Sequence, residues 1–257
     1  MYENRPLILI SNDDGVNAKG IRVLTDVLRD IADIIVMAPD GPRSGYSCAI
    51  TSVSPLRFSK VREEEGVTVY QCSGTPTDCI KIALHEVVPR RPDLVVGGIN
   101  HGDNSSVNVH YSGTMGVVLE GCLKGMPAIG FSLCDHAADA DFSPLIPYIR
   151  KITQEVLEHG LPAGTCLNVN FPKLPSFKGV KVCRQTKGEW SNEWQKCTHP
   201  RGGHYYWLTG SFLNAEVDAD DTDHWAMNHG YAAITPVQID MTAYTLFDEM
   251  KSWNLEV

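Results

Sequence analysis

Residues 7–15 read Leu7-Ile8-Leu9-Ile10-Ser11-Asn12-Asp13-Asp14-Gly15. Their apolar run predicts a buried strand, and two adjacent carboxylates follow directly where that strand ends. Ligands of parallel α/β sheets bind at the carboxyl ends of the strands, and a pair of acids there favours a hard divalent cation. The same residues are also good turn chemistry. This stretch alone therefore supports a turn and a metal site about equally.

Strand-like and helix-like patterns alternate on either side of this stretch over the first 170 residues. Helices are predicted at 18–31, 75–89, 112–124 and 143–159, and further strands at 33–37, 94–96, 128–133 and 167–171. Two strands at 53–61 and 67–72 flank an acidic turn and predict a hairpin. The alternation predicts an α/β fold with a mostly parallel sheet and helices on both faces.

One helix start is marked especially clearly. Thr75 is a good cap, Pro76 suits the first helical position, and Asp78 stands where the acid of a capping box belongs.

The pattern changes after Pro172. Residues 185–229 are rich in Trp, His, Gly and Asp, and they are too many for a structureless loop inside a compact domain. We expect an extended arm there, ordered by a partner subunit, followed by closing strands at 230–235 and 241–246. The chain thus divides into a core of residues 1–175 and a C-terminal region of residues 176–257.

Composition excludes several classes of protein. The net charge is −9, from 31 acidic and 22 basic residues, and no Lys/Arg run marks a face for duplex nucleic acid. No apolar stretch is long enough for a transmembrane helix, and Leu7–Ile10 is too short for a signal peptide core, so we expect a cytoplasmic protein. The eight cysteines form no C-x-x-C pair, which indicates reduced thiols rather than a zinc knuckle.

Four polar loops follow the predicted strands and should meet at one edge of the sheet. They contain, in order, Asp13 and Asp14; Ser44 and Gly45; Asn100 and Asn104; and Ser112, Gly113 and Thr114. Carboxylate, hydroxyl and amide oxygens suit Mg²⁺ or Mn²⁺ better than zinc. Each residue also has an ordinary reading: Ser44 as a turn residue, Asn100 bonding its own loop, and Ser112 and Thr114 as helix-start residues.

The helix that begins at Ser112-Gly113-Thr114 offers unpaired backbone N–H groups and the positive end of its dipole, which attract anions. Gly45 lets a backbone N–H approach an oxyanion closely. A metal beside an anion site is suited to cleaving a phosphate ester. Either aspartate could act in this reaction as nucleophile or as general base.

Taken together, the segments resemble the SurE (survival protein E) family of 5′-nucleotidases. The matching stretches, in chain order, are Ile10–Gly15, Ala38-Pro39-Asp40 with Arg43-Ser44-Gly45, Gly74–Cys79, Gly98–Asn104, Tyr111–Thr114, Leu167–Pro172 and Gly230–Pro236. The resemblance implies a Rossmann-like core, a C-terminal part that exchanges between subunits, and a homodimer or homotetramer.

The resemblance also implies an activity and a site. The activity is divalent-metal-dependent release of phosphate from nucleoside 5′-monophosphates, extending to 3′-monophosphates and short polyphosphate. One Mg²⁺ or Mn²⁺ per subunit falls on Asp13, Asp14, Ser44 and Asn100, and Asn104 joins the two aspartates as a catalytic residue. Phosphate or substrate contacts fall on Asn12, Gly45, Asn104, Ser112, Gly113 and Thr114.

The chain departs from the family pattern at Gly97, where the family usually has Ser, at residues 105–108, and most of all at residues 185–229. All the implied metal ligands are present. The departures therefore bear on base preference and oligomer geometry rather than on activity.

Three other readings compete with this one. A haloacid-dehalogenase phosphatase needs Asp-x-Asp after the first strand, whereas Asp13 and Asp14 are adjacent. A non-catalytic, Mg²⁺-binding receiver-like regulatory domain needs a phosphoacceptor Asp on a later strand, where this chain has Asn100. A dinucleotide-binding module needs G-x-G-x-x-G after the first strand, which is absent here.

Overall fold

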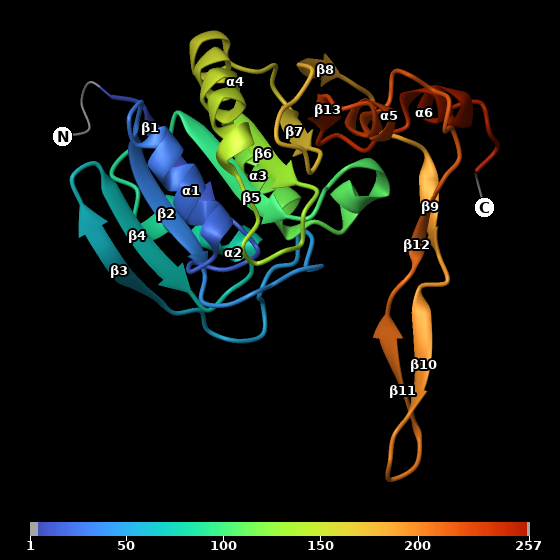
Figure 1. The fold of residues 1–257 in the computed structure, drawn as a ribbon. Helices are drawn as coiled ribbons and strands as arrows, with labels where there is room; N and C mark the ends of the chain where they lie inside the picture. The colour runs from blue at the N-terminus through green and yellow to red at the C-terminus, as the bar shows by residue number, and fades with distance from the viewer. Residues whose placement is uncertain (1–4, 256–257) are drawn as a thin grey trace.

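The computed structural model describes residues 5–255, which build a nine-stranded central sheet with helices on both faces (Figure 1). The strands of this sheet are β1 (Leu7–Ser11), β2 (Asp33–Pro39), β3 (Phe58–Glu64), β4 (Val67–Cys72), β5 (Leu94–His101), β6 (Ala128–Leu133), β7 (Thr165–Phe171), β8 (Val180–Val182) and β13 (Ala232–Gln238). The helices are α1 (Lys19–Leu28), α2 (Pro76–Glu86), α3 (Gly113–Leu123), α4 (Ile146–His159), α5 (Asp223–Asn228) and α6 (Tyr244–Met250), with short 3-10 helices η1 (Ser106–His110) and η2 (Ser143–Leu145).

The strand order is β3-β4-β2-β1-β5-β6-β7-β13-β8, so the first strand of the chain lies near the centre of the sheet. Neighbours from β4 to β7 pair in parallel, while β3 and β13 pair antiparallel with β4 and β7. Every residue of β1 is buried, because helices cover the sheet on both sides. The predicted α/β fold is therefore confirmed.

Each face of the sheet has its own apolar layer. Ile21 and Leu24 of α1 pack with Ile149 of α4 on one face. Ile80 of α2 and Val117 of α3 pack on the other face, against Leu9 of β1. The odd and even residues of β1 therefore serve opposite layers, as the period-two geometry of a strand requires.

The predicted capping box of α2 is confirmed. The Thr75 hydroxyl accepts from the Asp78 N–H at 3.1 Å, and the Asp78 carboxylate accepts from the Thr75 N–H at 2.9 Å.

Two predicted strands are corrected by the structure. Residues 53–57 lie outside any strand, because β3 begins only at Phe58, and Pro55 in that segment has no N–H to give a ladder. The strand predicted at 241–246 is replaced by helix α6, none of whose residues is buried.

Residues 188–214 form a long two-stranded ribbon that projects away from the sheet (Figure 1). It consists of β9 (Gly188–Ser191) paired with β12 (Ser211–Asn214), and β10 (Trp194–Thr198) paired with β11 (His204–Leu208). No helix within residues 5–255 has the length and apolarity needed to span a membrane.

Candidate active site

Three adjacent parallel strands, β2, β1 and β5, end at the same edge of the sheet. The loops that follow them and the start of α3 enclose a cavity of about 240 Å³. The predicted site residues that line it are Asp13, Ser44, Gly45, Asn100, Asn104 and Ser112. The loops are also joined directly, because the Arg43 N–H donates to the Asp13 carbonyl at 2.7 Å and the Ser47 N–H donates to the Tyr111 carbonyl at 3.1 Å.

Asp13 is buried against the start of α3, with only 4% of its surface exposed. The Thr114 hydroxyl donates to Asp13 Oδ1 at 2.6 Å. A Cβ atom on Gly113 would lie 2.6 Å from the Asp13 Cβ, so this close approach requires glycine at position 113. Burial raises the pKa of Asp13 to about 6, with a contribution from the neighbouring charge of Asp14, although hydrogen bonds from Thr114 and Gly113 oppose the rise.

Asp14 is less deeply buried than Asp13 and bonds to the neighbouring strand. Its Oδ2 accepts from the His101 N–H at 3.2 Å. Burial raises the pKa of Asp14 as well, while the His101 N–H and the two histidines at 101 and 136 act to lower it. Asp13 is therefore held toward α3 and Asp14 toward β5, and within residues 5–255 neither carboxylate forms an ion pair with a lysine or arginine.

Asn100 lies inside β5 rather than in the loop after it. The pairing of β5 with β6 shifts register between Gly97 and Asn100, and such a bulge re-aims side chains at the end of a strand. The Gly98–Ile99 peptide bond in this segment is cis. The Asn100 amide nitrogen donates to the Gly102 carbonyl at 2.7 Å, which leaves the amide oxygen for the cavity.

Asn104 is positioned by a buried network of amides and hydroxyls. Its N–H donates to Asn170 at 2.7 Å, its side-chain nitrogen donates to Ser132 at 2.8 Å, and its carbonyl accepts from Asn168 at 2.7 Å. Asn168 and Asn170 belong to the matching stretch Leu167–Pro172, to which sequence reasoning gave no role. Their alternation along β7 places both side chains on one face, toward the Asn104 loop.

Two predicted substrate contacts have other partners in the structure. Asn12 is fully buried, and both ends of its side-chain amide bond to Gly15, so it closes the turn instead of facing the cavity. Thr114 is also fully buried, and its hydroxyl is engaged by Asp13, so it orients a carboxylate instead of facing a phosphate. In both cases the short polar side chain satisfies a nearby buried group first.

Sequence reasoning missed other residues of the cavity wall. His136 lines the cavity and packs over Gly102, and its signal was its place shortly after the predicted strand 128–133. His101 also lines the cavity: it ends β5, bonds to the Ala137 carbonyl at 3.0 Å and packs edge-on against Phe142. Asp103, Asn108 and Tyr111 also line the cavity.

The electrostatics of this site call for a bound cation. Arg43 pairs with Asp40 and Lys173 pairs with Asp135, and no lysine or arginine in the described residues forms an ion pair with Asp13. A buried carboxylate without a positive partner is unfavourable, and a divalent ion would relieve that cost. Within residues 5–255 no cluster of three or more His, Cys, Asp or Glu side chains is placed to hold a metal. The donors at hand are therefore carboxylate, hydroxyl and amide oxygens, which fits Mg²⁺ or Mn²⁺.

The chain is similar to proteins of known family. Residues 8–192 match the family described as Survival protein SurE. The chain is 68% identical over 257 residues to the 5′-nucleotidase SurE of Phocaeicola vulgatus, covering all of both chains. It is 58% identical over 255 residues to the 5′-nucleotidase SurE of Bacteroides fragilis, covering 99% of this chain and 100% of the relative. The crystal structure of the Sure protein from Aquifex aeolicus superposes with a TM-score of 0.82 at 32% identity, covering 96% of this chain and 98% of that one.

Proposed function

The chain belongs to the Survival protein SurE family and is a metal-dependent 5′-nucleotidase, and we propose that the cavity at the sheet edge is its active site. The observation that carries this proposal is the convergence of Asp13, Ser44 and Asn100 on one cavity at the start of α3. The receiver-like alternative is not favoured, because relatives matched over the whole chain are named as nucleotidases.

Asp13, Asp14, Ser44 and Asn100 hold one Mg²⁺ or Mn²⁺ per subunit. Magnesium sites commonly keep positions for water and substrate beside a few protein oxygens, and these residues would supply those oxygens. The bound ion supplies Lewis-acid activation of the phosphoryl group and of water. Thr114 orients Asp13 for this task through its hydroxyl, and the His101 N–H does the same for Asp14.

The phosphate is held by backbone and amide groups of the same cavity. Gly45, Asn104 and the start of α3 at Ser112 and Gly113 surround the space beside Asp13. Helix N-termini and glycine N–H groups suit an anion whose charge grows during the reaction. Asn104, fixed by its buried network, is the catalytic amide. The 3′-monophosphates and short polyphosphate present the same phosphoryl group, and we include them as substrates.

A phosphate-release assay tests this proposal. The purified protein should release phosphate from nucleoside 5′-monophosphates with Mg²⁺ or Mn²⁺, lose that activity in excess chelator, and recover it when metal is restored. Asp14→Asn should lower kcat/KM by about a thousandfold or more while leaving the circular dichroism spectrum unchanged. The matched control is Asp26→Asn on the exposed face of α1. Turnover that survives both chelator and Asp14→Asn would refute the metal site.

The oligomeric state and the location in the cell belong to the same proposal. We place the protein in the cytoplasm as a homodimer or homotetramer joined through the C-terminal region. Exposed Tyr205 and Trp207 on the ribbon support the assembly. All eight cysteines are unpaired, which supports a reducing compartment.

A further inference from the structure

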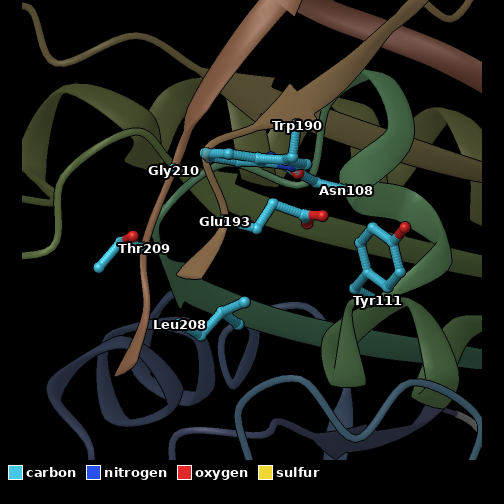
Figure 2. Close-up of a pocket in the computed structure, with 7 residues that line it drawn as sticks. All are labelled: Asn108, Tyr111, Trp190, Glu193, Leu208, Thr209 and Gly210. Carbon is cyan, nitrogen blue, oxygen red and sulfur yellow. Dashed lines mark hydrogen bonds between the residues drawn. The ribbon is translucent and has the colours of Figure 1, made fainter. Parts of the chain in front are cut away.

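A second cavity, of about 510 Å³, lies beside the active site (Figure 2). Asn108 and Tyr111 line both cavities, so the two are adjacent. The remaining wall comes from the ribbon, chiefly Trp190, Glu193, Leu208 and Gly210. A nucleotide whose phosphate lies beside Asp13 has this second cavity next to it for the rest of the molecule. Its volume is within the range of small-molecule sites.

Trp190 is held in one orientation before any ligand arrives. Its indole Nε1 donates to Asn108 Oδ1 at 2.8 Å, and Phe212 packs edge-on against the ring at 6.1 Å. Gly210 has φ +119°, and a Cβ atom there would come within 3.4 Å of the Trp190 ring and 2.9 Å of the Ser191 carbonyl. The positive φ and the close Ser191 carbonyl therefore require glycine at this position beside the Trp190 ring.

Glu193 supplies the charged group of this cavity, and its side chain is exposed. Figure 2 shows its carboxylate between the Trp190 indole and the Tyr111 ring in that view. Within residues 5–255 this carboxylate has no hydrogen bond or ion pair with another side chain. An aromatic wall beside an unengaged carboxylate suits a flat heterocycle that carries N–H donors.

We propose that this second cavity binds the nucleobase of the substrate, with Trp190 and Tyr111 contacting the base faces and Glu193 selecting guanine. This inference rests on the proposed function and names its preferred substrate. Guanine presents two adjacent donors, N1–H and N2–H, which match the two oxygens of a carboxylate. Adenine presents one donor beside an acceptor nitrogen, and uracil presents one donor between two carbonyls. Both place an acceptor against the carboxylate.

Several residues that line the second cavity lie beyond the residues matched to the family. The family match ends at residue 192, so Glu193, Leu208 and Gly210 lie beyond it. They also fall in the segment that departs most from the family pattern. Their place next to the proposed phosphate site suits them to setting which base is accepted.

The test compares kcat/KM for GMP, AMP and ribose 5-phosphate, which has no base. Wild type should prefer GMP to ribose 5-phosphate by about tenfold or more, the effect of stacking one base. Trp190→Ala should lower the ratio of GMP to ribose 5-phosphate by about tenfold. Glu193→Gln should lower the ratio of GMP to AMP by about tenfold, because an amide offers adenine one donor and one acceptor.

Matched controls separate this role from a structural one. Trp253→Ala and Glu189→Gln replace exposed residues outside the cavity and should leave both ratios unchanged.

Calorimetric binding of GMP in chelator is measured alongside for wild type and Trp190→Ala. If GMP binding depends on Trp190 but the protein releases no phosphate, the base site is supported and the proposed function is refuted. If the protein releases phosphate with equal kcat/KM from GMP and ribose 5-phosphate, the proposed function is supported and the base site is refuted. An equal loss on all three substrates in Trp190→Ala also overturns it.

Discussion

Asp13 is almost fully buried, and that burial governs both the stability of the metal-free protein and its readiness for a cation. A carboxylate removed from water and placed beside Asp14 resists ionisation, so its pKa rises to about 6. A bound divalent ion would stabilise the ionised form of Asp13 and so lower its pKa. The hydrogen bonds from Thr114 and Gly113 keep the carboxylate oriented toward the cavity in either case.

Asp13→Asn should therefore stabilise the metal-free protein at neutral pH. Because the folded pKa is above the unfolded value of about 4, ionised Asp13 destabilises the native state as pH rises from about 4 to about 6. The gain in the variant should reach about 3 kcal/mol at pH 7.5 and vanish near pH 4. Urea unfolding in chelator at both pH values measures it. A variant less stable than wild type at pH 7.5 would contradict this account of the site.

Thr114 should act on metal affinity through Asp13. Thr114→Val removes the hydroxyl that donates to Asp13 Oδ1 while keeping the side-chain shape. Loss of a partner that orients a ligand commonly weakens metal binding by about tenfold or more, so the Mn²⁺ concentration for half-maximal activity should rise by about that factor. Thr114→Ser retains the hydroxyl and should stay close to wild type. Equal behaviour of the Val and Ser variants would remove Thr114 from this role.

At the scale of elements, the starts of two helices show how sequence chemistry becomes architecture. The Ser112 hydroxyl accepts from the Met115 N–H at 3.0 Å and so begins α3 beside Asp13. In the capping box of α2, Asp78 also binds a residue that is distant in the sequence. Asp78 accepts from the Thr51 hydroxyl at 2.6 Å and so ties the loop after β2 to the start of α2.

Asp78→Ala should lower the free energy of unfolding by about 2 kcal/mol at pH 7, since it removes the cap and leaves partners at Thr51 and Thr75 unsatisfied. Burial alone would raise the pKa of Asp78, but the hydrogen bonds from Thr51 and Thr75 lower it overall. The stabilisation is thus present above about pH 4 and lost as pH falls through the lower, folded pKa. Denaturant titrations at pH 7 and pH 3 should show the gap between wild type and variant closing, with Asp26→Ala near wild type at both.

The strand predicted at 241–246 is wrong, because six residues are too few to distinguish a strand from a helix by the spacing of apolar residues. Extended to residue 253, the apolar residues recur every three positions at Met241, Tyr244, Phe247, Met250 and Trp253, which is helical spacing. Residues 241–246 contain only two of these five positions, so the helical spacing is not visible within them. Helix α6 buries none of its residues in this chain, so its apolar residues do not show the pattern of a helix packed on a core.

On the scale of the whole molecule, the C-terminal region reaches back to the active site. The fully buried Asp223 of α5 accepts from the Ser106 N–H at 2.8 Å and from the Thr186 N–H at 3.0 Å. Ser106 begins η1, which carries Asn108 to both cavities. The region after residue 175 therefore positions η1 at the cavity wall, in addition to forming the ribbon.

The ribbon should hold the oligomer together. Tyr205 and Trp207 are 42% and 63% exposed in the single chain, and burying such side chains between subunits is favourable. Replacing both with Asp should shift the mass measured by light scattering toward the monomer. Ser52→Asp with Ser54→Asp adds the same charge on another exposed loop and serves as the control. An unchanged mass in the ribbon variant would move the interface elsewhere.

The sequence by itself determined the alternating strands and helices, the capping box at Thr75, and the oxygen-rich loops that follow the strands. These features are local, because they depend on side-chain period and on residues within one turn. The three-dimensional fold alone reveals that Asn12 and Thr114 bond to buried partners, that His136 lines the cavity, and that the ribbon brings Trp190 and Glu193 next to that cavity. Those outcomes depend on which distant groups meet and on which polar atoms must be satisfied once water is excluded, and no spacing along the chain encodes that directly.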